Sequence, residues 1–153
     1  MASKTFKYSI ERELTMEDLK DAFTTAIEGG IGYWACLDNS TDDWKQARDE
    51  VAEELKSEQD SWKRAPTYDQ IAARLWEKGK PVVFCDAEGG SDVWELTAEK
   101  LAAGLIKLMR DRQAESEGDV LYDAKLAIES GELDAGDADV AVQYALFGEL
   151  VFG

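Results

Sequence analysis

The stretch PVVFCDAEGGSDVWELT, residues 81–97, carries the clearest signal for the fold. Residues 82–85 are a continuous apolar run, and residues 93–96 are a second run rich in residues that favour strands. The segment between them, residues 86–91, contains a Gly-Gly pair. Two short runs joined by a glycine-containing turn are typical of a β-hairpin. We therefore predict two antiparallel strands here.

Cap residues and helical spacing predict three helices around this hairpin. One follows Thr97, one covers residues 42–58, and one begins after Thr67 and ends at Gly79. Their apolar stripes are Leu101, Leu105, Leu108 and Met109; Trp44, Ala47, Val51 and Leu55; and Ile71, Leu75 and Trp76. Each stripe recurs every three or four residues, so each helix is expected to bury one side.

The N-terminal third is expected to add one more strand and one more helix. Residues 5–13 alternate between apolar and polar side chains, which predicts a half-buried strand. A helix follows over residues 16–28 and is expected to stop at Gly29-Gly30. Residues 31–37 are apolar and aromatic, which predicts a short buried segment.

The C-terminal part is expected to be helical with an apolar tail. Residues 121–128 favour a short helix, and Asp137 or Asp139 is expected to cap the last helix, which Gly148 ends. The tail ELVFG, residues 149–153, is too apolar for solvent and is expected to pack on the body.

These elements predict an α+β fold, a small antiparallel sheet of about three strands with packed helices. The 153 residues match the size of a single domain, 1–153. The chain has no apolar run long enough to cross a membrane and no signal-peptide pattern, so a cytoplasmic protein is expected.

The charge of the chain points to a basic partner. There are 33 acidic and 17 basic residues, a net charge of −16. Such a field repels nucleic acid and anionic membranes and attracts basic surfaces. We therefore expect no direct contact with nucleic acid or membrane. Solubility alone, or adaptation to high salt, also accounts for the excess of acidic residues. These two interpretations stay open beside that of a basic partner. Whether the chain forms a homodimer is open too.

The chain contains no histidine, which removes the commonest general base and the commonest metal ligand. We predict that the protein is not an enzyme and uses no metal and no cofactor. The segment DAGDAD, residues 134–139, lacks the spacing of a calcium-binding loop. The acids around the Gly-Gly turn, Asp86, Glu88 and Asp92, are typical of an exposed turn rather than of a catalytic pair.

The stretch EGGIGYWACLDN, residues 28–39, allows two interpretations. In the first, the glycines adopt the left-handed conformation at the end of a helix, and Tyr33 and Trp34 enter the core. In the second, the stretch is a ligand or docking loop made of Gly29, Gly30, Gly32, Tyr33 and Trp34.

Cys36 in this stretch and Cys85 are the only cysteines, without the spacing of a metal or redox motif. We expect two reduced, buried thiols.

Three motifs resemble a family of small conserved bacteriophage and prophage proteins of unknown function. They are EGGIGYWAC at residues 28–36, ELT at 95–97 and QYALFGELVFG at 143–153, in matching order over about a third of the chain. Residues 40–80 depart from the family pattern, which is consistent with an insertion. The resemblance implies a phage or prophage source and no particular mechanism.

From the acidity, the lack of histidine and the phage resemblance, we predict an inhibitor of a host defence system, of the anti-CRISPR or anti-restriction type. We expect it to act by binding a protein. Its acidic helices would imitate nucleic acid phosphates in the basic groove of a host nucleic-acid-handling protein. The candidate residues are Asp42, Asp43, Asp49, Glu50, Glu53, Glu54, Glu115, Glu117 and Asp119. The alternative is a protein that sequesters a nucleotide or another small ligand, with the Gly29–Trp34 loop and the basic pair Lys63-Arg64.

Overall fold

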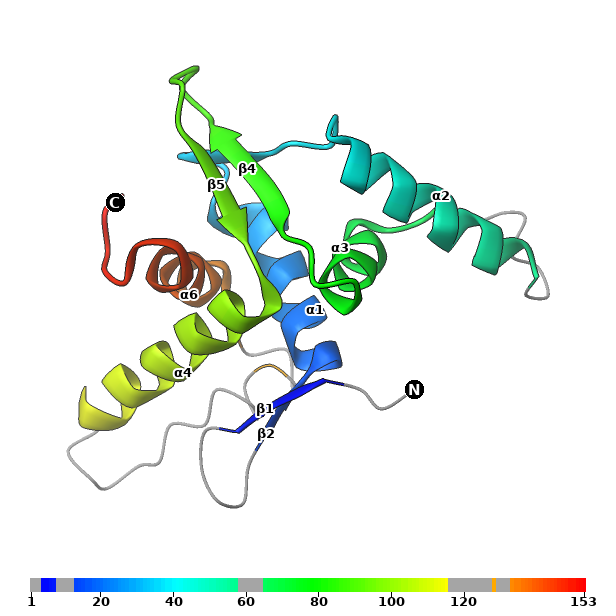
Figure 1. The fold of residues 1–153 in the computed structure, drawn as a ribbon. Coiled ribbons are helices and arrows are strands. Elements are labelled where there is room, and N and C mark those ends of the chain that lie inside the picture. The colour runs from blue at the N-terminus through cyan, green and yellow to red at the C-terminus, as the bar shows by residue number, and fades with distance from the viewer. Residues whose placement is uncertain (1–3, 8–12, 58–64, 116–127, 129–132) are drawn as a thin grey trace.

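The computed structural model describes residues 4–7, 13–57, 65–115, 128 and 133–153. Its strands are β1 (Thr5–Lys7), β2 (Glu13–Thr15), β3 (Ala35–Leu37), β4 (Val82–Asp86) and β5 (Val93–Leu96). Its helices are α1 (Met16–Thr25), the π-helical turn η1 (Ala26–Gly30), α2 (Asp42–Lys56), α3 (Tyr68–Glu77), α4 (Ala98–Glu115) and α6 (Ala135–Phe147). Helices packed around two small antiparallel sheets confirm the α+β class (Figure 1).

The predicted hairpin is present as β4 and β5, paired from Val82 opposite Leu96 to Cys85 opposite Val93. Gly89 adopts a φ of +84° in the turn, a conformation that costs glycine little. In Figure 1 the hairpin projects beyond the helices, with its base next to α4.

The third strand of this sheet is β3, in the order β3-β4-β5. It comes from the segment 31–37, for which the sequence predicted only a short buried segment.

The prediction of a single strand over 5–13 was wrong. Residues 5–7 are one strand, and they pair with residues 13–15 in a separate two-stranded sheet. An alternating pattern fits either arm of such a pair, so it does not show where one strand ends.

The inner face of the three-stranded sheet packs on α1 and α3. Phe23 of α1 meets Trp76 of α3 edge to face, with ring centroids 5.5 Å apart, and lies 6.4 Å from Phe84 of β4. The indole nitrogen of Trp76 donates a hydrogen bond to the carbonyl oxygen of Leu96 at 3.0 Å. A buried tryptophan thus ties α3 to the sheet and keeps its polar atom paired.

The helix ends follow local signals in most places. Thr41 caps α2, Thr67 and Gln70 form the expected capping box of α3, and Gly148 ends α6 with a φ of +75°. The prediction for the start of the last helix was wrong: Asp134 is the cap, and it accepts from the backbone nitrogen of Asp137 at 2.7 Å. Asp134 lies one turn earlier in the same acidic run, and the pattern DAGDAD did not separate the two choices.

Parts of the C-terminal predictions fall outside the described residues. The helix expected over 121–128 lies there, except for Ile128, which is buried. The tail packs on the body through Phe152, as expected, but Leu150 and Val151 are exposed, so the prediction that the tail avoids solvent was wrong for these two residues. Within the described ranges, no helix is both long enough and apolar enough to span a membrane.

Helices α4 and α6 lie side by side and pack closely at Gly104 (Figure 1). The predicted core residues Leu101, Leu105 and Leu108 are buried on this side of α4. A Cβ on Gly104 would overlap the carbonyl oxygen of Ala141 and lie 2.9 Å from the backbone nitrogen of Ala145. Only a glycine lets the two backbones approach this far.

We predict that Gly104→Ala lowers the free energy of unfolding by about 1–3 kcal/mol, because the added methyl group forces the two helices apart. Urea denaturation followed by tryptophan fluorescence measures this. Gly32→Ala is the control, since nothing lies within 4 Å of the place that its added methyl group would take. An exposed helical glycine would gain stability from the same change, so a more stable Gly104→Ala protein would contradict this packing.

Candidate protein-binding cleft

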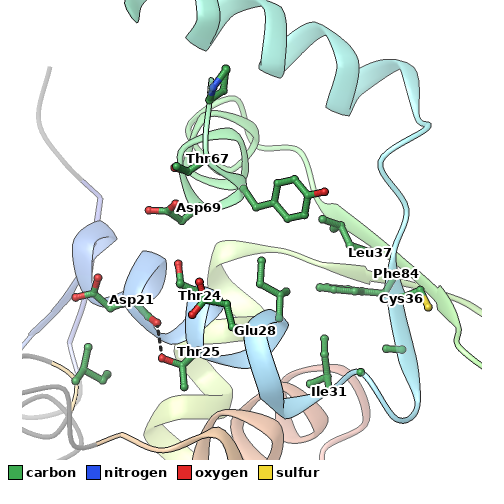
Figure 2. Close-up of a pocket in the computed structure, with 16 residues that line it drawn as sticks. Asp21, Thr24, Thr25, Glu28, Ile31, Cys36, Leu37, Thr67, Asp69 and Phe84 are labelled. Atoms are coloured by element: carbon green, nitrogen blue, oxygen red, sulfur yellow. Dashed lines mark hydrogen bonds between the residues drawn. The ribbon is translucent and has the colours of Figure 1, made fainter. Parts of the chain in front are cut away.

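A cleft of about 1230 Å³ opens between α1, η1, β3 and the start of α3 (Figure 2). Its lining residues are Asp21, Thr24, Thr25, Ile27, Glu28, Ile31, Gly32, Ala35, Cys36, Leu37, Pro66, Thr67, Tyr68, Asp69, Phe84 and Ile128. This volume exceeds the roughly 300–1,000 Å³ of typical small-molecule sites. The cleft therefore has room for a segment of a polypeptide.

The floor of the cleft is apolar. The half-buried side chains of Ile27 and Leu37 supply its accessible apolar surface, and the core residues Ile31, Ala35 and Phe84 line it with little exposed surface. Because β3 pairs with β4, Leu37 stands opposite Phe84 on one face of the sheet. Such a floor suits the aliphatic or aromatic part of a bound side chain.

The rim of the cleft is acidic and rich in hydroxyl groups. Figure 2 shows Asp69 on one side, with Thr24 and Glu28 across from it on the other. Asp21 is the third carboxylate. Among the described residues that line the cleft, none is a lysine or an arginine. Lys20 lies beside the rim, 4.0 Å from Asp69 and 3.5 Å from Glu17, and offsets part of the charge.

Burial and the neighbouring carboxylates both change the pKa of Asp21. Its pKa is raised above the ordinary 3.8, first by desolvation and then by the negative charges of Glu17 and Asp18. Asp69 across the cleft adds a smaller effect in the same direction. The rim favours a cation and opposes an anion because it carries three carboxylates and, among the described lining residues, no lysine or arginine.

The π-helical turn η1 sets one wall of the cleft. Neither Gly29 nor Gly30 has a positive φ, so the prediction of a left-handed helix end was wrong. The helix widens instead and continues through Gly30. A Cβ on Gly30 would lie only 2.8 Å from the carbonyl oxygen of Ala135, so glycine is needed here for the close approach of α6.

The five residues of the predicted ligand loop do not surround one cavity. Gly32 lines the cleft, whereas Gly30 is buried under α6. Trp34 is in the core, as expected, and its ring stacks on Phe152 with centroids 4.9 Å apart and planes 8° from parallel. The prediction that Tyr33 enters the core was wrong, since 51% of its surface is exposed.

A polar cluster explains why Tyr33 stays at the surface. Asp139 of α6 accepts hydrogen bonds from the Tyr33 hydroxyl at 2.6 Å and from the Trp34 indole nitrogen at 2.8 Å. Gln143, which is 1% exposed, donates to Asp139 at 2.9 Å. Its amide oxygen accepts from the backbone nitrogens of residues 151 and 152 at 2.8 Å each. Gln143 therefore fastens the C-terminal tail against Trp34.

The predicted acidic face on α2 is largely used to hold α3. Glu50 bonds to Lys78 at 3.0 Å and to Arg74 at 3.5 Å, and Glu54 also pairs with Arg74. The hydrogen bond from Lys78 is the main reason why the pKa of Glu50 is lowered.

The other carboxylates of α2 also have cations near them. Asp43 meets Lys80 at 2.9 Å, and Asp49 and Glu53 lie near Arg48 and Lys56 of the same helix at 3.4 Å each. Asp42 stands exposed in the first turn. Six acids of α2 thus face three bases of the helix itself, Lys45, Arg48 and Lys56, and three from beyond it, Arg74, Lys78 and Lys80. Glu77 also pairs with Arg74 at 3.8 Å, so seven acids and six bases leave this region close to neutral.

The remaining candidates lie at or outside the edge of the described residues. Glu115 is the last residue of α4, and its side chain is not described. Glu117, Asp119, Lys63 and Arg64 lie outside the described residues. Across the described part of the chain, no group of three or more His, Cys, Asp or Glu side chains is placed to hold a metal ion.

The two cysteines are free, but the expectation that both are buried was wrong. Cys36 is exposed and Cys85 is half-buried, because both belong to the outer face of the sheet, away from the core.

Sequence reasoning missed Asp21, Thr24, Thr25 and Asp69 as residues of the candidate site. A signal for part of it was present: Asp21, Thr25 and Glu28 follow the i, i+4, i+7 spacing of one helix side, as an apolar stripe does. Nothing in the sequence indicates that Asp69 lies opposite.

No family model matches the chain, and no curated protein or solved structure is significantly similar to it. The resemblance to phage proteins therefore stays a prediction, and the candidate site rests on geometry alone.

We predict that Gln143→Glu lowers the free energy of unfolding by about 1–3 kcal/mol, because a buried donor is lost and a second carboxylate faces Asp139. Urea denaturation measures the effect. Gln46→Glu, the same change at an exposed position of α2, is the control. Equal losses in the free energy of unfolding for the two substitutions would contradict the role of Gln143 in fastening the C-terminal tail.

We predict that Asp21→Asn raises the midpoint of thermal unfolding by about 1–3 °C at neutral pH. Because the pKa of Asp21 is raised by folding, its charged form costs stability above that pKa, and the cost disappears as the pH falls below the ordinary 3.8. The gain of the variant should therefore vanish in acid. Asp49→Asn is the control, and a gain of equal size there would contradict a local effect.

Proposed function

We propose that this protein is a binding protein without catalytic activity that holds a basic, amphipathic segment of a partner protein in the cleft. The observation that carries the proposal is the combination of an acidic rim and an apolar floor within one cleft. A lysine or arginine side chain has the matching chemistry, since its aliphatic stem packs on apolar surface while its charged head meets a carboxylate. An exposed ion pair between one carboxylate and one lysine or arginine contributes about 0.2–1 kcal/mol, so three such pairs together give useful selectivity.

The partner class follows from the charge of the whole chain. A net charge of −16 speeds encounter with basic surfaces, and proteins that handle nucleic acids carry such surfaces. With the resemblance to phage proteins, this supports an inhibitor of a host defence nuclease, restriction or CRISPR effector that acts in the host cytoplasm. In this proposal the cleft binds a basic segment of the host protein that would otherwise contact nucleic acid.

The cleft supports this role better than α2 does. Carboxylates that hold Arg74, Lys78 and Lys80 would have to leave those partners before they could imitate phosphates. In the cleft, by contrast, Asp21 and Glu28 form no ion pair with any base among the described residues. The imitation of nucleic acid by α2 therefore has less support than a peptide-like ligand in the cleft.

The nucleotide alternative also has less support. Its stacking residue, Trp34, already has Phe152 against its ring, and the acidic rim opposes phosphate. No observation on the described residues favours an anionic ligand.

The test uses a short fluorescein-labelled peptide of alternating arginine and leucine, with a glutamate-leucine peptide as the negative control. Fluorescence anisotropy at physiological salt measures the dissociation constant. We predict that the triple variant Asp21→Asn, Glu28→Gln, Asp69→Asn binds the basic peptide about tenfold more weakly, a loss near 1.4 kcal/mol.

The matched control removes the same amount of charge elsewhere. Asp42→Asn, Asp49→Asn, Glu53→Gln changes three exposed carboxylates of α2, and we expect it to alter affinity less than about twofold. Equal losses in the two triple variants would show attraction by net charge alone and would contradict the cleft. A loss only in the α2 variant would restore the mimicry hypothesis.

A further inference from the structure

Cys36 and Cys85 stand directly opposite each other on two neighbouring strands, β3 and β4. The ladder on either side contains the bonds from the nitrogen of Ala87 to the oxygen of Trp34 and from the nitrogen of Asp38 to the oxygen of Val83. Antiparallel pairs alternate between hydrogen-bonded and non-hydrogen-bonded sites, so the cysteine pair is a hydrogen-bonded one. The Cα atoms of such a pair are about 5.5 Å apart, within the roughly 4.4–6.8 Å of disulfides. Their Cβ atoms are also about 5.5 Å apart, beyond the roughly 3.5–4.5 Å of a relaxed disulfide, so the two strands must draw together by about 1 Å and the bond is strained.

The two side chains share the outer face of the sheet. Directly opposed residues of an antiparallel pair point to the same side. The Cys85 sulfur lies 3.6 Å from the backbone oxygen of Cys36, and both thiols are free. The side chain of Cys36 is exposed and its sulfur points away from the cleft in Figure 2, so a reagent from solvent can reach it.

We propose that Cys36 and Cys85 are a modification site that closes into a reversible disulfide in the presence of oxidised glutathione. The exposed Cys36 thiolate attacks one glutathione sulfur, forms a mixed disulfide and releases one reduced glutathione. Cys85 then loses its proton and attacks the Cys36 sulfur, which releases the second glutathione. Two thiols are oxidised by two electrons, the glutathione disulfide is reduced by two, and both protons leave on the two reduced glutathiones.

The roles of the two cysteines follow from their surroundings. Burial, more than the nearby charges of Asp38 and Asp86, raises the pKa of the Cys85 thiol, so Cys85 keeps its proton longer. Cys36 is the more exposed of the two thiols, so it reacts first and Cys85 completes the bond. Exposed cross-strand disulfides are readily reduced, which makes the bond reversible.

The bond would join the two ends of one excursion of the chain. Residues between β3 and β4 include α2 and α3, and the chain leaves the sheet after Leu37 and returns at Val82. A link between Cys36 and Cys85 closes this long loop at its base and holds the edge strand β3, a wall of the cleft, on β4. Since a closed loop restricts the unfolded chain, we expect the midpoint of thermal unfolding to rise by roughly 3–10 °C.

The experiment exposes the reduced protein to oxidised glutathione and counts free thiols by maleimide mass tagging, with intact mass and non-reducing electrophoresis alongside. We expect the wild-type protein to lose both thiols, to remain a monomer and to carry no glutathione at the end point. Reduced dithiothreitol should restore both thiols. The matched control, Cys85→Ser, should stop at a stable glutathione adduct on Cys36, whereas Cys36→Ser should react much more slowly.

Three outcomes would overturn the proposal. These are a stable glutathione adduct on the wild-type protein with Cys85 still free, disulfide-linked dimers, and two free thiols after exposure. Because these readouts need no bound peptide, they are independent of whether the cleft binds a basic segment. Basic peptide binding by both the reduced and the oxidised protein, measured by anisotropy, then shows separately whether the bond alters the cleft.

Discussion

The pairing of β3 with β4 is the constraint on which the candidate site depends. Its register places Leu37 opposite Phe84 on the inner face and Cys36 opposite Cys85 on the outer face. The inner pair gives the cleft its apolar floor, and the outer pair brings two thiols together. The same register closes the excursion that carries α2 and α3, and α3 supplies the rim residue Asp69. A slip of one residue would exchange the two faces and remove both features.

The acids of this chain have different physical roles in different places. Those of α2 neutralise bases of α2, α3 and the following segment, so they stabilise the packing of two helices. Asp139 organises Tyr33, Trp34 and Gln143 and thereby holds the C-terminal tail. The rim of the cleft is where carboxylates from α1, η1 and α3 line one cavity. Net charge alone does not separate these roles.

Local signals in the sequence were enough for most elements. The Gly-Gly turn between two apolar runs predicted β4 and β5, and threonine caps predicted the starts of α2 and α3. Signals that depend on distant residues were not readable. Gly30 is required by a carbonyl of α6, and β3 is recognisable only once β4 lies beside it. The cleft falls in this second class, because its carboxylates come from three elements that only the tertiary fold brings together.

The most direct measurement of the central claim is a nitrogen-15 NMR titration of the protein with the arginine-leucine peptide. The account predicts that the amide shifts which change most belong to residues 21–37, 66–69 and 84, the walls and floor of the cleft. Shifts concentrated on α2, residues 42–56, or spread evenly over the acidic surface, would contradict a binding site in the cleft.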